Sequence, residues 1–98
     1  MQQGNNIIDK YKTWLRLEKS LSANSIEAYL TDLDKLIRFV ESEGKDFATI
    51  SYQDLQQFVA QLRDIGIHPR SQARIISGIK SFYRFLLLDE YITADPTE

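Results

Sequence analysis

Basic side chains alternate with small side chains between residues 70 and 84, a combination that can bind an anion. The positive charges come from Arg70, Arg74, Lys80 and Arg84. Ser77, Gly78 and Ser81 lie between them. Arginine and lysine attract phosphates, small residues allow a phosphate backbone to approach closely, and serine hydroxyls donate hydrogen bonds to its oxygens. These residue types favour contact with a nucleic-acid backbone, and arginine can also reach base edges.

These residues share one side of a helix that the hydrophobic periodicity predicts from about 70 to 89. At about 100° per residue, five of them fall within an arc of about 80°, and Lys80 lies about 40° further round. The five are Arg70, Arg74, Ser77, Ser81 and Arg84, and we add Ser71 of the same helix as a candidate contact. The opposite side is apolar: Ile75, Ile76, Ile79, Phe82, Tyr83 and Leu86. An ordinary solvated surface is the alternative interpretation of such a basic face.

A second polar face is predicted on a helix from about 23 to 43. It offers five further candidate DNA contacts: Asn24, Ser25, Thr31, Lys35 and Arg38. Glu27 and Asp34 border the same surface, so a mixed solvated face is the alternative for this helix taken alone. The start of the helix is better suited, because free backbone N–H groups and the helix dipole favour a phosphate there. Capping by Ser22 is the structural alternative at that end.

Charge and composition limit the other function classes. The 98 residues carry 12 Lys and Arg against 14 Asp and Glu, and this net charge of −2 excludes a uniformly cationic surface but not a local one. No acidic residue lies between Gly66 and Leu88. With no Cys and one His, we expect no disulfide, no metal site and no cofactor. Because no apolar run is long enough to span a bilayer, we expect a soluble, cytoplasmic protein.

No group of residues is arranged for catalysis. His68 precedes a proline and is interpreted as an exposed loop residue instead of a general base. The carboxylates of the second predicted helix are interpreted as solubilising side chains: Asp32, Asp34, Glu41 and Glu43. The larger aromatic side chains lie on apolar faces and are expected in the core: Trp14, Phe58, Phe82 and Tyr83. We therefore assign no catalytic residue.

Four helical segments account for most of the chain, and no stretch alternates in the manner of a strand. We predict helices at about 6–19, 23–43, 52–65 and 70–89. Ser22 is a candidate N-cap, and Ser51 and Asp54 have the spacing of a capping box. Gly44 and Gly66 are placed to end the second and third helices. The sequence predicts a single all-α domain built like a four-helix bundle.

Two stretches resemble, in their order, the N-terminal core-binding (SAM-like) domain of Xer-type tyrosine recombinases and phage integrases. The first is LSANSIEAYLTDLDKLIRFV, residues 21–40, and the second is RSQARIISGIKSFYRFLLLDEYITADP, residues 70–96. The positions that fit the family pattern are Leu21, Ser22, Asn24, Ala28, Tyr29, Asp32, Leu33, Ser77, Ser81, Phe82, Tyr83, Arg84, Phe85 and Leu86. Two spaced motifs in the right order are more specific than either motif alone.

Four positions depart from the family pattern. Ser25 stands where Thr is usual, Gly78 where Ala is usual, Lys80 where Arg is usual, and Asp95 where Asn is usual. Gly78 costs the helix up to ~1 kcal/mol relative to Ala, which a close backbone approach would explain. Lys80 keeps the charge but loses the bidentate geometry of arginine, so we expect it to contact phosphate.

The resemblance implies that the second and fourth helices face double-stranded DNA and cross in its major groove. It also implies that residues 1–98 are a core-binding domain without the C-terminal catalytic domain, so that none of the five tyrosines is the nucleophile. Expected partners are double-stranded DNA, the recombinase's own catalytic domain and neighbouring protomers. The alternative is a helical protein-interaction module that binds an acidic partner or a neighbouring protomer.

Overall fold

The computed structural model describes residues 2–98, with side chains described from Ile7 onward. It contains four helices: α1 (Gln2–Leu17), α2 (Ala23–Ser42), α3 (Tyr52–Asp64) and α4 (Pro69–Leu88). The described residues include no strand, so the predicted all-α, four-helix fold is confirmed. Only α1 departs clearly from its predicted bounds, since it starts well before Asn6. Its apolar stripe begins at Ile7, and periodicity therefore gives no signal for the turn before it.

Side-chain caps set the starts of α2 and α3. The hydroxyl oxygen of Ser22 accepts a hydrogen bond from the backbone N–H of Ser25 at 3.2 Å. At α3, the backbone N–H of Asp54 donates to Ser51 Oγ at 3.1 Å, and the backbone N–H of Ser51 donates to Asp54 Oδ2 at 2.9 Å. Both predicted caps are confirmed. Such a cap contributes about 1 kcal/mol to helix stability.

The loops that flank α3 bring α4 to its starting point. Gly44 and Gly66 adopt positive φ angles of 69° and 88°, and they follow the ends of α2 and α3 as predicted. Pro69 is the first residue of α4, and His68 caps this helix because its Nδ1 accepts a hydrogen bond from the backbone N–H of Arg70 at 3.0 Å. The exposed histidine therefore has a structural role that its loop position did not indicate.

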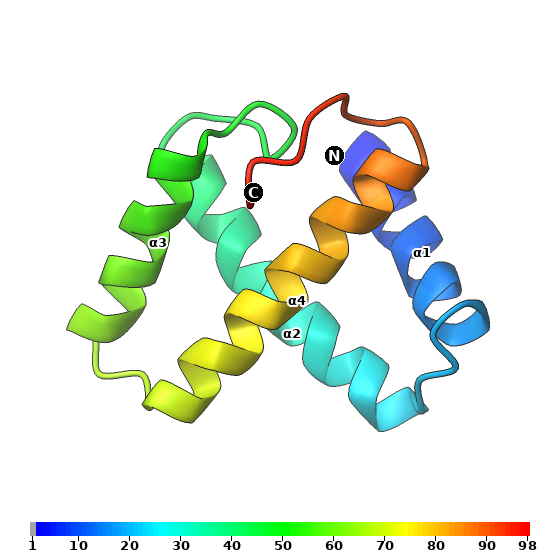
Figure 1. Ribbon diagram of the computed structural model, residues 1–98, viewed down its shortest axis with the longest axis horizontal. Helices are drawn as coiled ribbons and strands as arrows, with labels where there is room; N and C mark the ends of the chain where they lie inside the picture. The colour runs from blue at the N-terminus through cyan, green and yellow to red at the C-terminus, as the bar shows by residue number, and fades with distance from the viewer. Residues whose placement is uncertain (1) are drawn as a thin grey trace.

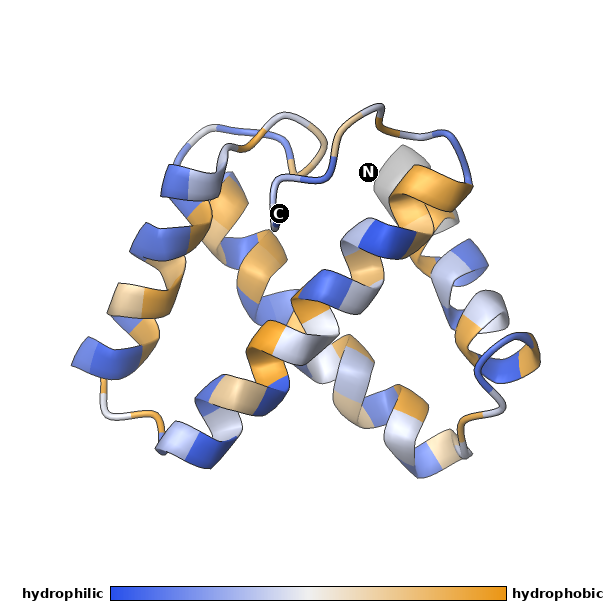
Figure 2. Cartoon of the chain, viewed as in Figure 1, coloured by the Kyte–Doolittle hydropathy of each residue, from blue (hydrophilic) through white to orange (hydrophobic). Residues whose placement is uncertain are grey.

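The two longest helices, α2 and α4, cross at the centre of the molecule, with α1 and α3 on either side (Figure 1). Both start toward the same edge, so their N-terminal halves diverge from the crossing (Figure 1). Apolar residues turn toward the middle of the molecule, as the side of α3 that faces α2 shows (Figure 2). The fully buried side chains at the centre are Tyr11, Leu15, Leu36, Ile75, Phe82, Tyr83 and Leu86. This core fixes the angle at which α4 lies across α2.

Two buried tyrosines tie α4 to its neighbours. The hydroxyl of Tyr11 on α1 donates to Ser81 Oγ at 3.1 Å, and the hydroxyl of Tyr83 on α4 donates to the carbonyl of Phe47 at 2.6 Å. Burial raises the pKa of Tyr11 to about 12 and also raises the pKa of Tyr83. The ring of Tyr11 packs edge-on against Phe82, with 5.1 Å between centroids. Each tyrosine therefore combines core packing with a satisfied polar group.

Candidate nucleic-acid interface

One side of α4 is exposed along its whole length and carries the basic residues. Five candidate contacts are exposed, namely Arg70, Arg74, Ser77, Lys80 and Arg84, and two are half-buried, namely Ser71 and Ser81. The apolar side holds the buried residues Ile75, Ile79, Phe82, Tyr83, Phe85 and Leu86. Tertiary packing of that apolar side is what turns the basic side outward. We call the exposed side, defined by the seven candidate contacts, the basic face of α4.

Asp32 of α2 reaches this basic face and holds Arg74. Arg74 Nε donates to Asp32 Oδ2 at 2.8 Å, and Arg74 Nη2 donates to Asp32 Oδ1 at 3.0 Å. The Asp32 side chain is 3% exposed and that of Arg74 is 54% exposed. The prediction that Asp32 is a solubilising side chain is therefore wrong. On a helix it projects beside Leu36 and Ala28, which places it on the side that packs against α4.

The negative charge of the Asp32 carboxylate also attracts a second cation, Lys35. Lys35 Nζ lies 3.8 Å from Asp32 Oδ1. The Asp32 carboxylate raises the pKa of the Arg74 guanidinium, first through its hydrogen bonds and then through its negative charge. Asp32 therefore neutralises part of the positive charge that α2 and α4 place at their crossing.

The remaining polar side of α2 carries charges of both signs. Arg38 Nε donates to Asp34 Oδ2 at 2.8 Å, one helical turn away, and both side chains are largely exposed. Thr31 is exposed between these residues and the start of the helix. The mixed solvated face that the sequence offered as an alternative is thus present on the exposed side of α2 around Asp34 and Arg38. Of the two predicted cations, only Lys35 lies beside the Arg74–Asp32 pair.

The start of α2 is exposed but its first N–H groups are partly occupied. Ser22 Oγ accepts from the Ser25 backbone N–H and also lies 3.2 Å from Ser25 Oγ. Asn24 is exposed in the first turn. The capping alternative is therefore realised at Ser25, and a phosphate at this helix end would meet the N–H groups that the cap leaves open.

The last residues of the chain return to the basic face. A groove of about 520 Å³ is lined by Ser77, Lys80, Ser81 and Arg84 from α4 and by Asp95, Thr97 and Glu98. Asp95 is held locally, because its Oδ1 accepts from the backbone N–H and the hydroxyl of Thr97 at 2.8 and 2.7 Å. The sequence gave no signal for this return, since it depends on how residues 89–98 pack over α4. The groove places two carboxylates beside the C-terminal half of the basic face.

Gly78 is buried on α4, and the phosphate approach that the sequence suggested for it stays a prediction. A Cβ added at this buried glycine would meet no atom within 4 Å outside its own helix. Contacts within the described chain therefore give no reason for a glycine at this position.

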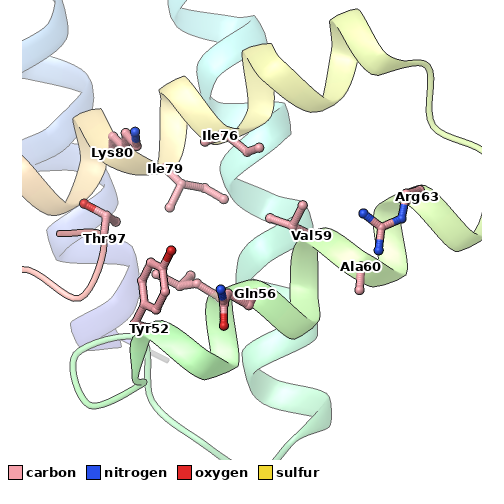
Figure 3. Close-up of a pocket in the computed structure, with 10 residues that line it drawn as sticks. Tyr52, Gln56, Val59, Ala60, Arg63, Ile76, Ile79, Lys80 and Thr97 are labelled. Atoms are coloured by element: carbon pink, nitrogen blue, oxygen red, sulfur yellow. The ribbon is translucent and has the colours of Figure 1, made fainter.

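A second groove lies between α3 and α4 and has a volume of about 480 Å³. Val59 of α3 and Ile76 and Ile79 of α4 face one another across it (Figure 3). Arg63 and Lys80 lie at its ends (Figure 3). The groove is apolar with a cationic rim, and from the sequence Ile76 and Ile79 were placed only on the apolar side of the predicted helix.

Residues 2–98 contain no group of three or more His, Asp or Glu side chains that could hold a metal ion. No described helix is both long enough and apolar enough to cross a membrane.

The fold and the site define a small helical domain in which a basic helix crosses a second long helix. Residues 8–90 match the model of the phage integrase N-terminal SAM-like domain, and the chain belongs to this family. The resemblance noted from the two sequence motifs is thereby confirmed.

Named relatives cover nearly the whole chain. Tyrosine recombinase XerD of Staphylococcus saprophyticus is 40% identical over 92 residues, which are 93% of this chain and 31% of that protein. XerD of Haemophilus ducreyi is 38% identical over 97 residues, 99% of this chain and 32% of that protein. Tyrosine recombinase XerC of Oceanobacillus iheyensis is 34% identical over 97 residues, 98% of this chain and 32% of that protein. The chain thus spans about a third of the length of these relatives.

Proposed function

We propose that this chain is the DNA-binding domain of a site-specific tyrosine recombinase and that it binds double-stranded DNA through α2 and α4. The observation that carries the proposal is the basic face of α4, which is exposed along its length and free of acidic residues in its own helix. Membership of the integrase N-terminal domain family supports a role in DNA recombination. The named relatives, all tyrosine recombinases, point the same way.

The distribution of charge supports contact with phosphates at three positions. No ion pair is formed by Arg70, Lys80 or Arg84 within residues 7–98, whose side chains are described. These cations can therefore attract DNA without first breaking a pair, and Ser77 lies among them as a hydrogen-bond donor. The N-terminal halves of α2 and α4 diverge from the crossing (Figure 1). Two separate helix ends are therefore available to enter a major groove.

Strand breakage and rejoining belong, in this proposal, to a catalytic domain outside the 98 residues. The relatives are about three times as long as this chain, which leaves room for such a domain. Tyr11 and Tyr83 are buried and hydrogen-bonded, with pKa values raised above the ordinary range, and so are unsuited as nucleophiles. The catalytic domain and neighbouring protomers on DNA are the further partners we propose.

The proposal is tested by titrating the chain against duplex DNA over a salt series and measuring the dissociation constant by gel mobility shift. Binding should weaken steeply with salt because each neutralised phosphate releases counterions. Arg84→Ala should weaken binding and lower the salt slope by about one unit. Arg74→Ala should also weaken binding. Arg16→Ala, which removes an exposed cation from α1, is the matched control and should change neither quantity.

Two results would contradict the proposal. The first is no binding even at low salt, and the second is an affinity that does not depend on salt. Equal affinities for Arg74→Ala, Arg84→Ala and the unchanged chain would remove α4 from the interface while leaving DNA binding itself in place.

A protein-interaction module remains the second candidate, and the groove between α3 and α4 favours it. Its apolar floor is bordered by Arg63 and Lys80, which suits an acidic peptide with apolar anchors (Figure 3). Saturating this groove with such a peptide would shift the NMR signals of Val59 and Ile76. Duplex DNA would instead shift residues of the basic face.

A further inference from the structure

Asp32 is the one buried charged residue in the described part of the chain, and it lies beneath the basic face of α4. It contacts two cations, Arg74 through two hydrogen bonds and Lys35 at 3.8 Å. A carboxylate here reduces the attraction of the surface for phosphate. Affinity for DNA alone therefore does not explain why Asp32 lies beside Arg74 and Lys35.

The two hydrogen bonds fix one edge of the Arg74 guanidinium and leave the other edge open. Asp32 occupies Nε and one hydrogen of Nη2, while a guanidinium carries five N–H donors in a rigid plane. The Nη1 group and the second Nη2 hydrogen remain available. With 54% of the Arg74 side chain exposed, this open edge is accessible to a ligand.

We propose that Asp32 is a positioning residue that holds Arg74 in the orientation required to recognise DNA sequence. The inference rests on the proposed function, because it assigns a role to a residue within the same DNA-binding surface. Phosphate attraction tolerates many orientations of a cation, whereas bidentate contact with a base edge requires one. Restricting the arginine before binding also lowers the conformational entropy lost on contact. Asp32 thus reduces attraction for DNA in general and increases discrimination between sequences.

Asp34 provides a matched control on the same helix. Its pair with Arg38 is exposed on both sides, so it does not fix the arginine in the way that Asp32 does. Asp32→Asn and Asp34→Asn each remove one negative charge from α2. They differ in whether an arginine of the basic face loses its anchor.

The experiment measures two dissociation constants for each variant by fluorescence anisotropy. One probe is the duplex that the unchanged chain selects from a randomised pool, and the other is a scrambled duplex of the same composition. Asp32→Asn should lower the ratio of the two constants about tenfold, the size of one lost bidentate base contact, while binding to the scrambled duplex is retained or strengthened. Asp34→Asn should leave the ratio unchanged.

A double-mutant cycle with Arg74→Lys tests whether Asp32 acts through Arg74. Lysine keeps the charge but has no fork for the carboxylate to orient. Arg74→Lys should lower the ratio as Asp32→Asn does, and the double variant should show no further loss. A full further loss in the double variant would show that Asp32 acts elsewhere.

Each remaining outcome decides the inference. An unchanged ratio for Asp32→Asn overturns it while leaving DNA binding intact. A chain that binds DNA without preferring any selected duplex also overturns it, and a chain that binds no DNA overturns the proposed function as well. If thermal unfolding shows that Asp32→Asn does not fold, Arg74→Lys alone decides, and an unchanged ratio in that variant is the contradicting result.

Discussion

Asp32 and Asp34 lie two residues apart on α2 and form two different kinds of ion pair. The Asp32 side chain is 3% exposed and joins α2 to Arg74 on another helix. The Asp34 side chain is 56% exposed and pairs with Arg38 one turn further along α2. In the sequence the two look alike, as acidic residues on a predicted amphipathic helix. The inner pair, Arg74–Asp32, links two helices. The outer pair, Arg38–Asp34, lies on the surface of one helix.

The difference teaches that the direction of a side chain, and not its charge, decides its role on this surface. Two residues along a helix rotate the side chain by about 200°, so one carboxylate faces α4 and the other faces solvent. Water screens the outer pair but not the carboxylate of the inner pair. The same contrast separates the buried hydroxyls of Tyr11 and Tyr83 from the more exposed pair of Lys45 and Asp54 at the start of α3.

Removing the two carboxylates in turn should change the free energy of unfolding by very different amounts. Asp32→Ala should lower the free energy of unfolding by about 2 kcal/mol, because two hydrogen bonds to charged groups between α2 and α4 are lost. Asp34→Ala should change it by no more than about 0.5 kcal/mol. Urea unfolding of both variants gives the two values, and equal losses would contradict the distinction.

Alkaline pH should destabilise the fold through its buried tyrosines. The pKa of Tyr11 is about 12 in the folded chain, and the unfolded chain ionises near 10. The folded state therefore holds more protons above pH 10, and stability falls as pH rises. From pH 9 to 11 Tyr11 should contribute a loss of about 1 kcal/mol, and Tyr83, whose pKa is also raised, adds to it.

Tyrosine variants show which group causes this loss. Tyr11→Phe should flatten the decline of unfolding free energy between pH 9 and 11, whereas Tyr52→Phe, at an exposed position on α3, should not change it. Chemical unfolding at fixed pH values provides the measurement. A decline of equal slope in Tyr11→Phe would show that the Tyr11 hydroxyl is not protected by the fold.

Two glycines should respond in opposite directions to substitution by alanine. Gly78 lies in α4 with open space around a Cβ, so Gly78→Ala should stabilise the chain by about 0.5 to 1 kcal/mol through helix propensity. Gly44 has a φ of +69°, so Gly44→Ala should destabilise it by about 1 kcal/mol. Thermal unfolding compares the two, and a loss of stability in Gly78→Ala would reveal crowding around this position.

The smallest effect on stability is expected at the α3 cap, where the Lys45–Asp54 pair is more exposed than the carboxylate of Asp32. Lys45 Nζ lies 2.6 Å from Asp54 Oδ1 and, together with the Ser51 backbone N–H, holds the pKa of the Asp54 carboxyl below its ordinary value. The resulting stability is present above the ordinary pKa of an aspartate and is lost as pH falls through the lowered one. Lys45→Ala should shift the acid-unfolding midpoint slightly upward, and an unchanged midpoint would show that the pair contributes nothing.

The helices could be predicted from the sequence because their signals are local. Apolar spacing, the Ser22 cap and the Ser51–Asp54 capping box lie within a few residues of the elements they define. The start of α1 was missed because it precedes the first apolar residue of its stripe. The sides of α4 were also correctly assigned, since helical projection needs only the sequence of that helix.

The parts of the site that were missed depend on contacts between distant residues. The Arg74–Asp32 pair joins positions 42 residues apart, and no charge pattern within either helix indicates it. The position of Asp32 near Leu36 on a helical projection was the one signal within the helix that pointed to its burial. Likewise, the return of Asp95 and Thr97 to the basic face follows from packing after α4 and has no local signature.

If α2 and α4 together form the surface that contacts DNA, both helices should respond when DNA binds. Backbone NMR chemical shifts, recorded while duplex DNA is added to the isotope-labelled chain, test this most directly. The largest shifts are expected at Arg70, Ser77 and Arg84 on α4 and at Asn24 and Thr31 on α2. Shifts confined to α1, with the basic face of α4 silent, would contradict it.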